Sequence, residues 1–172
     1  MPLRPGQSPA AFGHRKQLFI KRFSIMIKRI LSEGQLIAII IRRSYESNGI
    51  SFFTPEDFSQ QLAYMKRPAG HKIAPHLHNE VQRSIFMTQE VLMIKSGRVK
   101  ADFYDNDRKY IESTVLYPGD VILLASGGHG FEMLEESEII EVKQGPYSGE
   151  NDKTRFKPSE ASPAFNKESE AK

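Results

Sequence analysis

Residues 90–133 read EVLMIKSGRVKADFYDNDRKYIESTVLYPGDVILLASGGHGFEM, and this stretch decides the fold class. The apolar residues Val99, Ala101 and Phe103 alternate with polar neighbours, which is the period of a strand with one buried face. Turn sequences recur at short intervals around it: Ser96-Gly97, Asp105-Asn106-Asp107, Tyr117-Pro118-Gly119-Asp120 and Ser126-Gly127-Gly128. Short strands at this spacing, without helices between them, predict an all-β sandwich or barrel.

Two further elements are expected before this stretch. Residues 35–43 are rich in isoleucine and predict a buried strand. The run Thr54-Pro55-Glu56-Asp57 has the composition of a helix start, because threonine suits the cap and proline suits the first helical position. We therefore expect a short helix near residues 55–60.

Composition divides the chain of 172 residues into three parts. Residues 1–31 are basic, with no acid before Glu33, and we expect a poorly ordered arm. Residues 32–147 are dense in apolar residues and form the expected domain, whereas residues 148–172 form a polar tail with a disordered end. A basic arm can bind nucleic acid or a membrane surface, or serve in targeting. No aromatic stacking platform accompanies the charges, so we favour a solvated extension and do not expect nucleic-acid binding.

The chain has no cysteine, which excludes disulfides and thiolate metal sites. Any metal must therefore be held by nitrogen and oxygen ligands. The longest strongly apolar run, residues 36–41, is far shorter than the roughly 20 residues of a membrane helix. No secretory signal pattern is visible, and we expect a cytoplasmic protein that does not enter a membrane.

The histidines His76 and His78 flank a single leucine. On a strand both imidazoles would project to the same side, and Pro75 favours extended backbone before them. Paired imidazoles are good ligands for transition metals, although two ordinary surface or hydrogen-bonded histidines remain the alternative for this pair alone. His71 lies an odd number of residues from His76, so it would face the other way; we assign no role to it or to His14.

The surroundings of this pair resemble the first motif of the cupin superfamily. That motif runs glycine, five residues, HxH, three or four residues, glutamate, six residues and glycine. Gly70 to His78 matches its first part, and Glu90 to Gly97 matches its second part. The gap between the parts, residues 79–89, is longer than in the family, and Glu80 is a competing carboxylate. The resemblance implies a cupin double-stranded β-helix, which is a jelly-roll barrel.

Residues 119–131 resemble the second cupin motif. They are one residue short, lack its proline and are followed by Met133 in place of its asparagine. By resemblance, His129 is the third imidazole ligand. The two motifs together imply one divalent metal ion (Zn, Mn, Fe or Ni), held by His76, His78, Glu90 and His129.

The function is less specified than the fold, because cupins include dioxygenases, sugar isomerases, epimerases, decarboxylases, storage proteins and ligand sensors. Residues 140–152 also resemble the end of the cupin domain in type II phosphomannose isomerases. This resemblance favours a sugar-phosphate or nucleotide-sugar ligand and a metal-dependent isomerase or epimerase. Two alternatives stay open: a non-catalytic cupin that binds a small molecule, and an Fe(II) dioxygenase with the same ligands.

No catalytic residue is assigned from the sequence. An isomerase needs a base beside the metal, and Glu132 and Glu141 are candidates. Contacts to a phosphate are candidate roles for Lys95, Arg98 and Lys143, although for each of them an ordinary solvated charge is the favoured interpretation.

The partners that we expect are a small polar molecule and a second copy of the chain. Cupins commonly pair through strands at the N-terminal edge of the barrel, and this resemblance implies a homodimer. Residues 37–41 either contribute to that contact as an edge strand or lie inside the fold.

Overall fold

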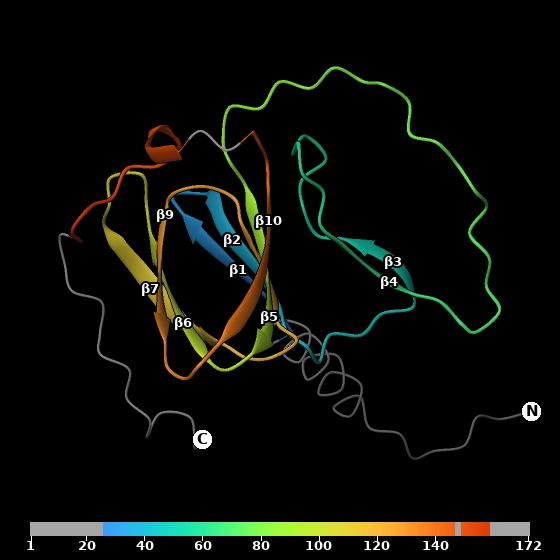
Figure 1. The fold of residues 1–172 in the computed structure, drawn as a ribbon, viewed down its shortest axis with the longest axis horizontal. Coiled ribbons are helices and arrows are strands. Elements are labelled where there is room, and N and C mark those ends of the chain that lie inside the picture. Colours follow the sequence, from blue (N-terminus) through green and yellow to red (C-terminus); the bar gives the residue numbers. More distant parts are fainter. Residues whose placement is uncertain (1–25, 147–148, 159–172) are drawn as a thin grey trace, which may run out of the picture.

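The computed structural model of the chain describes residues 26–146 and 149–158 (Figure 1). These residues contain ten strands in antiparallel pairs and one short 3-10 helix, which confirms the predicted all-β class. The elements are β1 (Ile27–Ser32), β2 (Gln35–Ile41), β3 (Gly49–Phe52), β4 (Ala63–Lys66), β5 (Glu90–Ser96), β6 (Val99–Tyr104), β7 (Tyr110–Leu116), β8 (Val121–Leu124), β9 (Gly128–Met133), β10 (Glu138–Lys143) and the 3-10 helix η1 (Gly149–Asp152).

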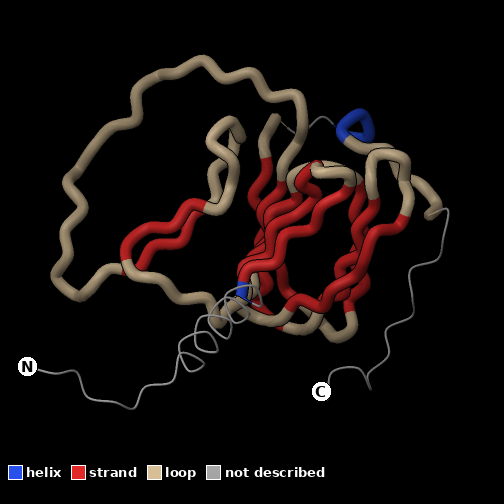
Figure 2. The backbone as a smooth tube through the Cα atoms, turned by 180° about the vertical axis from the view of Figure 1, so that it is seen from behind, coloured by secondary structure: helices blue, strands red, loops and turns tan. Residues whose placement is uncertain are grey.

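The strands form two facing sheets and a separate hairpin (Figures 1 and 2). The larger sheet has the order β1-β2-β8-β5-β10, and the smaller sheet has the order β7-β6-β9. Strands β3 and β4 pair with each other. Neither large sheet closes on itself, so the described part of the chain is an open two-layered sandwich, and a closed jelly-roll barrel is not confirmed.

The main core fills the space between the two sheets, as strand alternation predicts. In β6 the apolar face consists of Val99, Ala101 and Phe103, each fully buried. They pack in one cluster with side chains from the larger sheet. That cluster also contains Ile30, Ile37, Ala38, Ile40, Leu92, Ile94, Leu116, Ile122 and Leu124.

A second cluster lies on the outer face of the larger sheet. The segment between β3 and β4 places Phe53, Phe58 and Leu62 against the outward-facing side chains of Ile39 and Leu123. This segment was predicted to contain a helix near residues 55–60, and that prediction is wrong, because the structure has only turns and bends there.

Thr54, the predicted helix cap, closes a turn in this segment. The Thr54 hydroxyl donates to Gln61 Oε1 at 2.9 Å and accepts the Leu62 amide at 3.2 Å. The Gln61 amide in turn donates to the carbonyls of Pro55 and Phe58, each at 2.9 Å. These bonds close a turn and direct the chain back into β4, so no helix develops.

Residues 67–88 leave the sandwich as a wide arc between β4 and β5 (Figures 1 and 2). Every residue of this segment is exposed. We name residues 67–88 the arm; they are distinct from the basic N-terminal segment, residues 1–31. The exposed side chains include large apolar groups, with Leu77 94% and Phe86 93% accessible. The arm contains the predicted HxH pair, so this motif lies outside the sandwich of its own chain.

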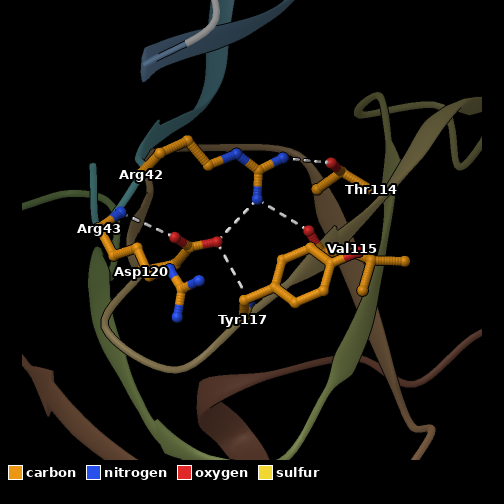
Figure 3. Close-up of polar contacts among 6 residues, drawn as sticks. All are labelled: Arg42, Arg43, Thr114, Val115, Tyr117 and Asp120. Atoms are coloured by element: carbon orange, nitrogen blue, oxygen red, sulfur yellow. Dashed lines mark hydrogen bonds and ion pairs between the residues drawn. The ribbon is translucent and has the colours of Figure 1, made fainter. Parts of the chain in front are cut away.

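A polar cluster fixes the turn before β8 (Figure 3). The Asp120 carboxylate is buried and accepts hydrogen bonds from the Arg42 guanidinium at 2.7 Å and from the Arg43 amide at 2.9 Å. The same carboxylate accepts the Tyr117 amide at 3.1 Å. The glycine of the predicted type II turn, Gly119, has a φ of 87°, a region that only glycine enters readily.

The first strand overlaps the segment predicted to be a basic N-terminal arm, residues 1–31. The larger sheet begins at Ile27, inside the segment that we assigned to the basic arm. Residues 1–25, which include His14, lie outside the described residues, as do residues 147–148 and 159–172. Within the described tail, Phe156 packs edge-on against Tyr104 with ring centroids 5.3 Å apart.

Candidate metal centre

Two of the four predicted ligands meet at one end of the sandwich interior. Glu90 begins β5 on the same strand face as Leu92 and Ile94, which belong to the main core. His129 lies opposite the buried Phe103 in the register of β9 and β6, and therefore on the same face. Both side chains thus point between the sheets, where His129 Nε2 lies 3.4 Å from Glu90 Oε2.

The spacing of this pair suits two ligands of one ion, and it equally suits a direct ion pair between the imidazole and the carboxylate. Donor atoms that bind a metal at about 2.1 Å in tetrahedral geometry lie about 3.4 Å apart. The observed distance between His129 Nε2 and Glu90 Oε2 has this value. An imidazole nitrogen with a carboxylate oxygen suits Zn, Mn, Fe or Ni, so the donors present fit the predicted group.

The electrostatics of the site favour a charged carboxylate. A hydrogen bond with His129 lowers the pKa of Glu90, and the charges of His129, Lys143 and Lys153 act in the same direction, against the effect of desolvation. The Glu90 side chain is 19% exposed, so these charges are only partly screened by water. Glu90 is therefore held in the form that ligates metals.

Lys143 is the one phosphate-contact candidate that reaches this site. It lies directly opposite Glu90 in the β10–β5 register, and its Nζ is 3.7 Å from Glu90 Oε1 and 3.4 Å from Glu141 Oε1. Burial opposes the charge of Lys143, but Glu141, Glu90 and Asp152 outweigh it and raise the pKa of the lysine. A cation thus stands beside the candidate ligands.

The other phosphate-contact candidates lie elsewhere. Lys95 is near the opposite end of β5 and pairs with Glu138 at 2.7 Å. Arg98 lies in the turn after β5 and pairs with Glu135 at 2.8 Å. Strand alternation could not distinguish them from Lys143, because the pairing of β5 with β10 is a non-local feature.

The two candidate bases, Glu132 and Glu141, lie in different sheets and on different faces. Glu141 lies opposite Leu92 and shares the interior face of the larger sheet with Glu90. Glu132 lies opposite Lys100 on the outer face of the smaller sheet, with its carboxylate 3.8 Å from the lysine Nζ. Of the two, only Glu141 is positioned toward the site.

The C-terminal segment passes this same end of the sandwich, which sequence reasoning did not anticipate. Thr88, just before β5, donates to Asp152 of η1 at 3.3 Å. Lys153 follows η1 and is close enough to Glu90 to lower its pKa. Phe156 then lies against Gly128, at the start of the strand that contains His129. The only signal in the sequence is the apolar Phe156 in a polar tail.

The histidine pair is not at this site in the single chain. His76 and His78 lie in the arm with ring centroids 5.3 Å apart, and His76 Nδ1 lies 2.9 Å from the Ala74 carbonyl oxygen. Among the described residues, no group of three or more His, Asp or Glu side chains is placed to hold a metal ion. The predicted ligands thus form two pairs, and the four-ligand site stays a prediction.

The remaining candidates in the arm are exposed as well. Glu80, the competing carboxylate, and His71 are both solvent-accessible. In the described ranges, no helix has the length and apolar character needed to cross a bilayer.

Comparisons with known proteins returned no match: no family model fits the chain, and no curated protein or solved structure is significantly similar to it.

Proposed function

We propose that the chain is a cupin-type metal-binding protein that acts on a small anionic, sugar-derived molecule, with a metal-dependent isomerase or epimerase as the best-supported activity. The main support is the pair of Glu90 and His129, which points between the sheets with the spacing of two metal ligands. In this proposal His76 and His78 supply the other two ligands. When bound, the ion acts as a Lewis acid for a carbonyl or hydroxyl oxygen of the substrate.

The chain's own residues supply the remaining functions. Lys143 and Lys153 provide positive charge at the open end of the sandwich, where a phosphate or another anionic group would bind. Glu141 lies on the same interior face and is the base that moves a proton beside the carbonyl. The Lys143 ammonium lies 3.4 Å from Glu141 Oε1 and forms an ion pair with this carboxylate.

Elemental analysis tests the metal site. We expect about one equivalent of a divalent metal in the parent protein and little in Glu90→Gln or His129→Ala. His71→Ala is the matched control, because it removes an exposed histidine outside the predicted ligand set, and it should retain the metal. A parent that takes up no Zn, Mn, Fe or Ni after reconstitution would contradict the proposal.

Ligand binding tests the substrate class. Lys143→Gln should weaken the binding of a sugar phosphate by roughly 10-fold, the size of one lost charge-assisted hydrogen bond. Lys95→Gln is the control, because Lys95 is paired with Glu138 away from the site. Binding without turnover would favour the non-catalytic alternative. Oxygen consumption by an iron-loaded protein would favour the dioxygenase.

A further inference from the structure

The arm has two features of an interaction segment: exposed apolar side chains and backbone without a strand partner. Its large apolar side chains are largely uncovered by the described residues: Ile73, Leu77, Val81, Ile85, Phe86 and Met87 are all exposed. Residues 72–87 also have no strand partner within the described part of the chain. A segment of this length that is both apolar and unpaired indicates a surface that is covered in the working assembly.

The sandwich has matching open edges. Among the described strands, β9 pairs with β6 alone and β10 pairs with β5 alone, so each presents an unpaired row of backbone groups. His129 lies on β9 with its imidazole between the sheets. A strand added to the free edge of β9 would place alternate side chains on that same interior face, which is the arrangement that the spacing of His76 and His78 provides.

The charges of the two elements are complementary. Residues 67–89 contain Arg67, Lys72 and Arg83 but only one acid, Glu80. Residues 128–143 contain five glutamates and one lysine. Four of these glutamates are paired with cations of their own chain (Lys95, Arg98, Lys100 and Lys143), so the edge formed by β9, β10 and the turn between them keeps only a small excess of acid to face the basic arm.

A second copy explains the arm's direction better than refolding onto its own chain. The arm is held at both ends: β4 pairs with β3, and the Gln89 amide donates to the Gln144 side chain at 2.5 Å. Between these points the arm projects away from its own smaller sheet (Figures 1 and 2).

Two more apolar surfaces are exposed, both belonging to the larger sheet and the hairpin that packs on its outer face. One is the outer face at Met93, Ile140 and Val142, and the other is the β3–β4 hairpin, with Ile50, Phe52 and Met65. Refolding of the arm onto β9 of its own chain would leave this face and the hairpin exposed, which favours a second copy as the occupant.

We propose that the arm docks along the free edge of β9 in a second copy of the chain and brings its His76 and His78 to Glu90 and His129 of that copy. The metal content of this arrangement rests on the proposed function, but the docking of the arm does not. Each metal centre is then shared between two copies, and neither copy completes a centre alone.

Complementation between two defective chains tests the shared centre. One chain has His76→Ala and His78→Ala, and the other has Glu90→Gln and His129→Ala; they are co-expressed with different tags, and the mixed dimer is isolated. Each variant alone should bind no metal, whereas the mixed dimer should bind about one ion, half the parent's content per chain. If the parent binds metal and the mixed dimer binds none, the arm acts within its own chain and the proposal is overturned.

Cross-linking tests the docking independently of metal. The natural chain has no cysteine, so Leu77→Cys in one chain and Gly130→Cys in another create a defined pair. A Cβ at Gly130 meets nothing within 4 Å, so this substitution is tolerated. Mild oxidation should give a covalent dimer of the two chains, whereas Leu77→Cys mixed with Asp107→Cys, in the β6–β7 turn, should not.

The outcomes of the two experiments can be told apart. A covalent dimer from a parent that binds no metal would retain the docked arm and reject the proposed function. If the parent binds metal but the two cysteine chains do not cross-link, docking of the arm on a second copy is overturned and the proposed function stands. Sedimentation of the parent as a monomer at the cross-linking concentration would also overturn docking of the arm on a second copy.

Discussion

Residues 90–133 and the arm, residues 67–88, follow one another in the chain but differ in how they are stabilised. The first stretch buries one face of each strand against a facing sheet, so that its own neighbours satisfy its apolar groups. The arm exposes apolar groups of similar size to solvent. Each stretch holds half of the predicted metal ligands. The comparison shows one stretch that is covered by its own neighbours and another, with half of the predicted ligands, that lies exposed to solvent.

The sharpest comparison uses the same residue type in both regions. Phe103 is fully buried in the main core, and Phe103→Ala should lower the free energy of unfolding by about 3–5 kcal/mol. Phe86 is 93% exposed, and Phe86→Ala should leave the unfolding of the dilute chain unchanged while weakening self-association. Urea unfolding at low and high protein concentration measures both effects. Equal losses in the two variants at low concentration would contradict the division.

The polar cluster at Asp120 tests whether the sandwich depends on one buried charge. Asp120→Ala leaves Arg42 and two backbone amides without their acceptor, and we expect a loss of about 3 kcal/mol in urea unfolding. Glu46→Ala breaks the exposed pair with Lys66, next to the arm, and should cause no measurable loss. A stable Asp120→Ala protein would show that the turn is held by its backbone alone.

Removal of metal should lower the stability of the parent, whose sandwich and arm both supply ligands, and should leave the stability of a variant without the arm ligands unchanged. Saturating metal at 100 times its dissociation constant should stabilise the parent by about 2.7 kcal/mol relative to the chelator-treated protein. The His76→Ala, His78→Ala double variant should lose this difference, and His71→Ala should keep it. Thermal unfolding with and without chelator gives the comparison. A full metal response in the double variant would show that the arm has no role in the site.

The smallest effect is expected from pH. In metal-free protein the pKa of Glu90 lies below its usual value of 4.5, mainly through its hydrogen bond with His129. The stability that this carboxylate contributes is therefore complete above pH 4.5 and is lost as pH falls through the lowered pKa. Glu90→Gln should show a shallower loss of stability in that acid range, as measured by urea unfolding at several pH values. Identical acid profiles for parent and variant would show that the pair is not formed in solution.

The parts of the structure that were predictable from sequence are those encoded by local pattern. Alternation at Val99, Ala101 and Phe103 predicts β6, and the order of proline and glycine predicts the turn at Gly119. The prediction of a helix near residues 55–60 was wrong, because Thr54 and Gln61 bond to each other and to backbone groups of the turn that precedes β4, which no local signal reveals.

The site was only half predictable for a related reason. Glu90 and His129 were found by motif, and the sheet registers bring them together. The selection of Lys143 over Lys95 depends on how β10 pairs with β5, and the contribution of Lys153 depends on the path of the tail. The position of His76 and His78 depends on the path of residues 67–88, which no local pattern in the sequence specifies.

Anomalous diffraction from crystals of the metal-loaded full chain tests the central claim most directly. We predict one anomalous peak per chain between the sheets, with Glu90 and His129 as ligands at about 2.0–2.2 Å and with His76 and His78 of a second copy completing the shell. A peak held by other residues, or a metal bound only at the exposed arm, would contradict the claim.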